Sequence, residues 1–137
     1  MVEVTYMGDW PDDVKATISL EFDPMVFLLP SWCRSLFIYF ENEPTERQAA
    51  AVSTNYEGRH INMFVRPNWF METADDRERV LLHEITHTHT QPIRNVFSDA
   101  IAGQDEQFRD FAWARFKETW EGAVEDLAWT LYLAMKK

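Results

Sequence analysis

Alternating apolar and polar residues mark four short segments in the first half of the chain. Alternation with a period of two predicts strands with one buried face, and β-branched and aromatic residues favour the same conformation. The pattern predicts strands at Met1–Met7, Ser35–Glu41, Ala49–Tyr56 and Arg59–Arg66. Because Glu57-Gly58 provides a tight connection, we expect the last three segments to form a small antiparallel sheet of about three strands.

Helical spacing of apolar residues characterises most of the other segments. Pro11–Glu21 begins with proline and acidic residues, as helices commonly do, and its Val14 and Ile18 lie four residues apart. Asp23–Leu29 predicts a second short helical piece, and Asp105–Ala134 predicts one long helix. The apolar stripe of the long helix consists of Phe108, Ala112, Phe116, Trp120, Ala123, Val124, Leu127 and Leu131.

A further helix is predicted before Pro92. Thr73 and Asp76 have the spacing of a capping box in which aspartate replaces the usual glutamate. Proline disrupts helices and restricts the residue before it, so the helix is expected to end near residues 89–90. Ile93–Gly103 is then expected to be a connection with one helical turn.

Length and composition restrict the class of protein. With 137 residues, positions 1–137 are expected to form a single domain. The net charge of −10 argues against nucleic acid or an anionic membrane as the main partner. Cys33 is the one cysteine, so no disulfide can form within the chain, which suits a reducing cytosol. Because neither a signal peptide nor a membrane-spanning run is visible, we expect a cytoplasmic location.

The predicted helix before Pro92 contains the sequence His83-Glu84-x-x-His87. Two histidines four residues apart on a helix project from one face, one turn apart. Their imidazoles can bind one Zn²⁺ at about 2.0–2.1 Å, and Glu84 can then exchange a proton with a zinc-bound water. The competing interpretation is a chance arrangement of two core or surface histidines, and the helical context favours the zinc site.

A catalytic zinc site needs a third protein ligand. His89 lies about 200° around the helix from His87, and His60 alternates with the apolar face of its strand, so neither is favoured. On the long helix, Glu121 is the glutamate closest to the buried edge, and Glu125 is the second candidate. An acidic residue on a helix usually lies on its solvated face, and this alternative stays open for both.

The two motifs together resemble the gluzincin group of zinc metallopeptidases. His83-Glu84-x-x-His87 is followed by Trp120-Glu121-Gly122-Ala123-Val124-Glu125, similar to the E-G-x-A-[DE] pattern that carries the third ligand in that group. The resemblance implies that Glu121 is the metal ligand and that Glu125 supports a ligand histidine. Val124 departs mildly from the alanine that is usual at its position.

The order of strand hairpin, motif helix and glutamate helix also resembles the minimal zincin core. It implies an α+β fold in which the sheet packs against the motif helix and a long C-terminal helix. In that core the strand before the motif helix, here Arg59–Arg66, borders the substrate cleft. The size and the H-E-x-x-H-x-H-x-x-P arrangement are similar to small metallopeptidase-like proteins of phages and other mobile elements.

These observations predict a zinc-dependent peptidase in which Glu84 is the general base and an extended peptide or protein segment docks along a strand edge. Tyr56, His60 and Arg66 are candidate donors to the transition-state oxyanion, and none is favoured. One alternative is a non-catalytic zinc fold that binds a partner protein, and another is an interaction module without metal. The sequence does not determine the oligomeric state.

Overall fold

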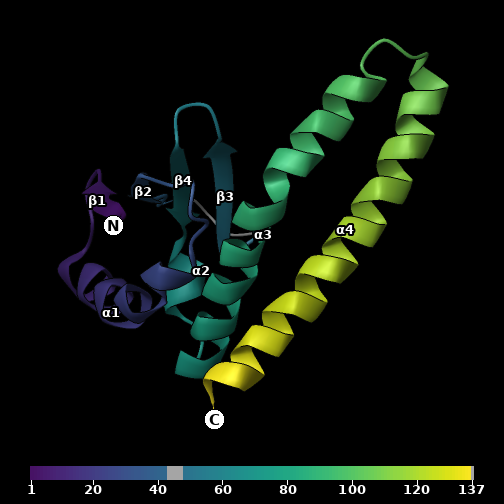
Figure 1. The fold of residues 1–137 in the computed structure, drawn as a ribbon. Coiled ribbons are helices and arrows are strands. Elements are labelled where there is room, and N and C mark those ends of the chain that lie inside the picture. The colour runs from purple at the N-terminus through teal and green to yellow at the C-terminus, as the bar shows by residue number, and fades with distance from the viewer. Residues whose placement is uncertain (43–47, 137) are drawn as a thin grey trace.

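The protein has an α+β fold, seen in a computed structural model that describes residues 1–42 and 48–136 (Figure 1). Most predicted elements are present at nearly the predicted positions, and the short helix α2 was not predicted. Within residues 1–42 and 48–136, none of the helices combines the length and the apolar character that a membrane span requires. In chain order the elements are β1 Glu3–Met7, α1 Asp12–Phe22, the 3₁₀ helix η1 Asp23–Leu28, β2 Ser35–Phe40, β3 Ala50–Asn55, β4 His60–Val65, α2 Pro67–Phe70, α3 Ala74–Ile101 and α4 Glu106–Met135.

The sheet corrects the predicted antiparallel meander of three strands. It has four strands in the order β1-β2-β4-β3, and both β1–β2 and β2–β4 are parallel pairs. The antiparallel hairpin joins β3 and β4. Parallel neighbours require a crossover connection, and α1 supplies one between β1 and β2. The more apolar β4, with fully buried Ile61, Met63 and Val65, takes an inner position, while β3, with Ser53 and Thr54, lies at the edge.

One face of the sheet forms the core with α1 and α3. Strand residues facing this core alternate with half-exposed residues such as Tyr39 and Phe64, whose rings stack at 5.2 Å between centroids. α4 packs on the other side of α3, so that α3 lies between the sheet and α4 (Figure 1). The central core residues are Ile18, Phe22, Leu36, Ile38, Ile61, Met63, Val65, Leu81, Leu82 and Ile85.

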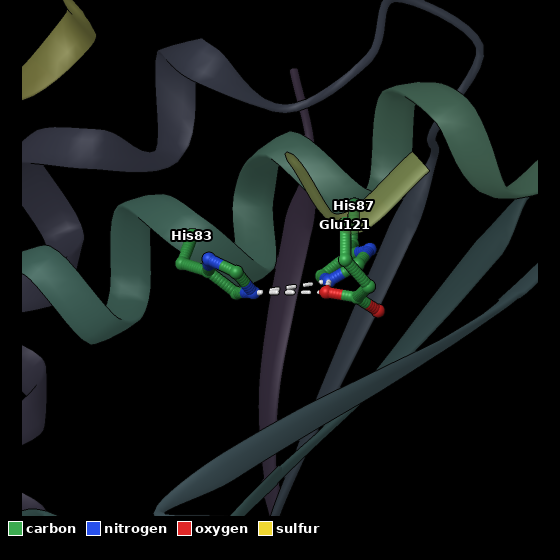
Figure 2. A group of neighbouring side chains, drawn as sticks. All are labelled: His83, His87 and Glu121. Carbon is green, nitrogen blue, oxygen red and sulfur yellow. Dashed lines mark hydrogen bonds and ion pairs between the residues drawn. The ribbon is translucent and has the colours of Figure 1, made fainter. Parts of the chain in front are cut away.

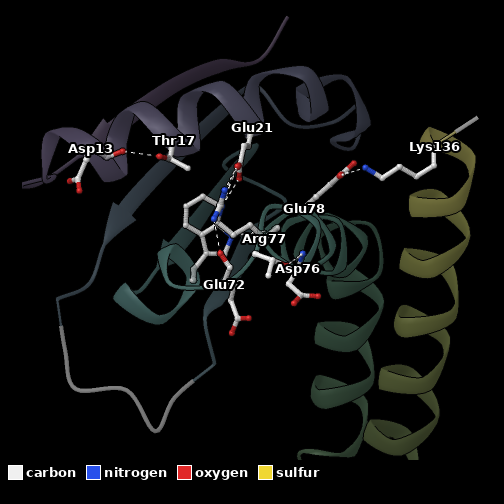
Figure 3. A network of polar contacts seen from close by, with 10 residues as sticks. Asp13, Thr17, Glu21, Glu72, Asp76, Arg77, Glu78 and Lys136 are labelled. Atoms are coloured by element: carbon white, nitrogen blue, oxygen red, sulfur yellow. Dashed lines mark hydrogen bonds and ion pairs between the residues drawn. The ribbon is translucent and has the colours of Figure 1, made fainter.

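Polar contacts fix the start of α3 against its neighbours (Figure 3). The predicted N-cap is confirmed, because the Asp76 amide donates to Thr73 Oγ1 at 3.2 Å. The Arg77 guanidinium donates to both carboxylate oxygens of Glu21 in α1, at 2.6 to 3.1 Å. These contacts set the position of the helix that carries the two histidines.

The predicted end of α3 near residues 89–90 is wrong, because the helix continues through Pro92 to Ile101. Proline removes one backbone donor, which weakens a helix but does not end it when other contacts hold the next turn. Such contacts come from α4, where Trp120 Nε1 donates to Thr90 Oγ1 at 2.6 Å. The Arg94 guanidinium lies 4.9 Å from the centre of the Trp113 ring. Tertiary packing therefore outweighs the local effect of Pro92.

The long C-terminal helix is confirmed as α4, which packs along α3 (Figure 1). Asp105 caps its start by accepting a hydrogen bond from the Phe108 amide at 2.9 Å. The predicted apolar stripe is covered only in part, because α4 packs on one helix rather than on the sheet. Within α4 the buried residues are Val124 and Ala128, whereas Leu127 is about half exposed.

Candidate metal centre

The imidazoles of His83 and His87 face the same space on α3. They lie one helical turn apart, and their Nε2 atoms are 3.1 Å from each other. His89 is directed elsewhere, since its Nε2 lies 2.7 Å from the carbonyl oxygen of Leu28. His60 lies on β4 beside the ring of Phe37, away from this pair. The two histidines of the predicted motif are thus the pair that converges.

Glu121 completes the cluster from the neighbouring helix α4 (Figure 2). Its Oε2 lies 3.4 Å from His87 Nε2 and 3.8 Å from His83 Nε2. Ligands at about 2.0–2.1 Å from a tetrahedral zinc ion are about 3.3 Å from one another. The three distances between ligand atoms are close to that value, so the two imidazoles and the carboxylate fit one zinc ion with a position left for water.

Glu125 takes a different place beside His83. Its Oε2 lies 2.8 Å from His83 Nδ1, on the opposite side of the ring from the Nε2 that faces Glu121. A carboxylate at the second ring nitrogen fixes the orientation and tautomer of a ligand histidine. This geometry distinguishes the two acidic candidates, since Glu121 joins the cluster of ligand atoms and Glu125 supports it.

The environment of His87 favours its neutral form. Burial lowers the pKa of this imidazole, although the nearby Glu121 carboxylate partly opposes the shift. The Trp120 ring contacts the imidazole edge to face, with 4.6 Å between ring centroids. A neutral imidazole at physiological pH is the form that binds a metal ion.

Glu84 is a buried carboxyl group next to the cluster, with 6% of its surface exposed. Burial raises its pKa to about 8, and the charge of Glu121 adds to this rise. Arg66 and a hydrogen bond with the backbone of Val52 act in the opposite direction. A carboxyl group with this pKa can hold and release a proton near neutral pH.

The strand beside the cluster is β3, which corrects the expectation for Arg59–Arg66. β4 is paired on both sides, by β2 and β3, and so has no free edge. β3 has an open edge that faces α3, where Gln91 Nε2 donates to the carbonyl oxygen of Val52 at 3.1 Å. Glu84 also bonds to the backbone of Val52, so both side chains tie α3 to this edge.

Two cavities meet at Glu84, one on the side of each histidine. The cavity on the His83 side has a volume of about 410 Å³ and is lined by residues 48–50, by Glu72 before α3, and by side chains of α3 and α4 that include Asp76 and Arg79. The cavity on the His87 side is smaller, about 170 Å³. Its lining residues are Gln48, Ala51, Val52, Glu84, His87, Gln91, Arg94, Trp120 and Glu121.

The predicted candidates for an oxyanion donor do not line either cavity. Tyr56 packs against Trp32, and His60 packs against Phe37. Arg66 is held by the Glu41 carboxylate at 3.1 Å and by the Gln48 carbonyl at 2.6 Å. Arg94 and Gln91 also line the His87-side cavity and were not predicted from the sequence. Both lie on α3 after His87, whereas the helix was expected to end near residues 89–90 and a connection was expected to follow.

The donor set has the chemistry of a zinc site. Two imidazole nitrogens and one carboxylate oxygen are the usual protein ligands of catalytic zinc, and a buried carboxyl group lies beside them. No family model, no curated protein and no solved structure matches the chain. The geometry of His83, Glu84, His87 and Glu121 is therefore the feature that bears on function.

Proposed function

We propose that this protein is a zinc-dependent peptidase of the gluzincin type with a minimal zincin-like fold. His83, His87 and Glu121 would hold the metal, and Glu84 would act as general base. The observation that carries the proposal is the approach of three ligand atoms from two helices to distances of 3.1, 3.4 and 3.8 Å. We further propose a cytoplasmic location, in keeping with the single buried cysteine, Cys33.

The expected reaction is hydrolysis of a peptide bond. Bound zinc supplies Lewis acidity, which lowers the pKa of water and polarises a carbonyl group. Glu84 accepts a proton from the attacking water at a carboxylate oxygen and delivers it to the leaving amide nitrogen. Burial of this carboxyl group keeps bulk water from competing for the proton.

An extended peptide is the substrate that best suits the open edge of β3. In an antiparallel edge strand, alternate residues direct their backbone groups away from the sheet. The Ala49 carbonyl accepts from the Arg66 amide, so Ala50, Val52 and Thr54 are the residues with outward backbone groups. A peptide could add along this edge by main-chain hydrogen bonds, with the contacts of Gln91 and Glu84 to the Val52 backbone exchanged for contacts to the peptide.

The decisive experiment combines elemental analysis with a peptidase assay. The Glu84→Gln variant should keep near-stoichiometric zinc and lose about a hundred- to ten-thousandfold in kcat. Glu118→Gln, which removes an exposed carboxylate on α4, is the matched control and should retain activity. Hydrolysis that persists in Glu84→Gln would refute the assigned mechanism, and purified protein without zinc would refute the metal site.

A second candidate function is a non-catalytic zinc fold that binds a partner protein. It is favoured by the raised pKa of Glu84, because a buried carboxyl group that stays protonated would serve structure rather than proton transfer. In that case His83→Ala would lower the melting temperature sharply, whereas Glu84→Gln would change it little. Melting curves with and without chelator, beside the peptidase assay, separate the two functions.

A further inference from the structure

Arg94 lines the His87-side cavity, and among the described residues that line it no other is an arginine or a lysine. Its guanidinium lies 4.9 Å from the centre of the Trp113 ring and 5.9 Å from that of Trp120. Trp120 is itself held by its hydrogen bond to Thr90 and by its contact with His87. Two aromatic rings thus fix the charged group at a defined distance from the candidate metal centre.

Arg94 has hydrogen-bonding capacity left for a ligand. Over residues 1–42 and 48–136, its one side-chain hydrogen bond goes to Asn95 Oδ1 at 3.2 Å, and it forms no ion pair with a carboxylate. A guanidinium has five donors in a planar fork that matches the two oxygens of a carboxylate. By contrast, Arg66 and Arg77 are each paired with a glutamate.

The two cavities differ in charge on either side of Glu84. Besides Glu84, the His83-side cavity is lined by Glu72, Asp76 and Glu125 against the single cation Arg79. Besides Glu84, the His87-side cavity is lined by one carboxylate, Glu121, and by the cation Arg94. Its volume of about 170 Å³ accommodates a small polar group such as one carboxylate rather than a large side chain.

We propose that Arg94 is a specificity-determining residue that binds a carboxylate of the substrate in the His87-side cavity. The inference rests on the proposed peptidase function and names its substrate class, which is a peptide with a carboxylate close to the scissile bond. That carboxylate is either the C-terminus of the peptide or the side chain of an aspartate or glutamate.

The test compares peptides that differ in one carboxylate. One arm pairs peptides with a free C-terminus against the same peptides with an amidated C-terminus, and the other pairs aspartate against asparagine at each position of a blocked peptide. Wild-type protein should show a lower KM for the carboxylate member in one arm, by about ten- to a hundredfold. Arg94→Gln should remove this difference, because KM for the carboxylate member should rise to the value for its uncharged counterpart.

Two further variants control for charge and folding. Arg109→Gln removes an exposed arginine that lines a separate cavity on the α3–α4 hairpin, and it should keep the carboxylate preference. Arg94→Lys keeps the charge and loses the planar fork, so it should keep only part of the preference. Equal preference in wild type and Arg94→Gln would overturn the proposal, as would equal loss in Arg109→Gln.

Calorimetry makes the inference independent of turnover. Glu84→Gln protein, with and without zinc, is titrated with the acid and amide forms of the same short peptide. Tighter binding of the acid by about tenfold or more, lost on adding Arg94→Gln, supports the assignment even if no peptide is cleaved. Absence of cleavage in the wild type would then refute the peptidase function alone, whereas equal binding of acid and amide would refute the role of Arg94.

Discussion

The middle of α3 and its C-terminal part differ in what covers them. In the middle part, residues 81–88, every residue except His83 is buried. In the open hairpin, which we define as residues 92–119 of α3, the turn and α4, no residue is buried. One continuous helix therefore passes from a core environment to a two-helix layer within a few turns.

The open hairpin is held together by aromatic stacking rather than by a core. Phe97 of α3 stacks on Phe116 of α4 with 4.4 Å between centroids, and Trp113 and Trp120 extend the stack. This stack fixes the position of α4 along α3, and that position decides which glutamate meets the two histidines. The buried part of α3 therefore fixes His83 and His87, while the exposed part sets the register of Glu121.

The largest expected effect comes from the same substitution at two positions of α3. Ile85 is fully buried and Ile93 is 64% exposed. Ile85→Ala should lower the free energy of unfolding by about 2–5 kcal/mol, because it leaves a cavity in the core. Ile93→Ala should change it by less than about 0.5 kcal/mol. Urea unfolding of both variants measures the difference, and similar losses would show that the hairpin is covered in solution.

The next effect concerns a buried carboxyl group and its pH dependence. Burial raises the pKa of Glu84 from 4.5 to about 8, so the folded state favours the protonated form. In metal-free protein, this contribution to stability is fully present below the unfolded-state pKa and is lost as the pH rises through about 8. Relative to Glu84→Gln, wild-type protein should lose about 4 kcal/mol of unfolding free energy between about pH 5 and about pH 9.

Chelator-treated samples unfolded in urea over this pH range provide the measurement. Glu118→Gln, which changes an exposed carboxylate in the open hairpin, serves as the control and should keep the pH dependence of the wild type. If wild type and Glu84→Gln lost stability in parallel, the carboxyl group of Glu84 would not be buried in the metal-free protein.

A smaller effect is expected where α1 holds the start of α3. Arg77→Met removes a guanidinium that donates to both oxygens of the Glu21 carboxylate, and both side chains are mostly buried. The loss should be about 2 kcal/mol, less than for a fully buried pair because water reaches both groups. Arg109→Met, at an exposed arginine of the open hairpin, should cost less than about 0.5 kcal/mol. Thermal unfolding with matched buffers compares the two, and equal costs would contradict the assigned role of the Glu21 contact.

The features that were predicted correctly from the sequence are those that depend on local interactions. The His83–His87 spacing, the Thr73 cap and the long C-terminal helix depend on residues near one another, and the structure confirms these elements. The identity of the third metal ligand could be narrowed to Glu121 and one other glutamate, because helical periodicity limits which residues of the long helix face inward.

The sequence-based predictions were wrong where contacts between distant segments of the chain determine the structure. The parallel pairing of β2 with β4 depends on a crossover, and the alternation within each strand says nothing of its direction. The passage of α3 through Pro92 depends on contacts from α4, thirty residues further along the chain. Arg94 was missed for the same reason, since its environment is built by Trp113 and Trp120.

The smallest effect tests whether the outer side of α4 is open even beside the candidate metal centre. Gly122 follows Glu121 in the middle of α4, and an added Cβ would meet no atom within 4 Å. Glycine inside a helix is less favourable than alanine, so Gly122→Ala should raise the free energy of unfolding by about 0.5–1 kcal/mol. Zinc affinity should stay at the wild-type value, because the new methyl group would lie away from both histidines. A gain in stability together with weaker zinc binding would mean that α4 packs more closely on this side in solution, and that the register of Glu121 depends on the absence of a side chain at position 122.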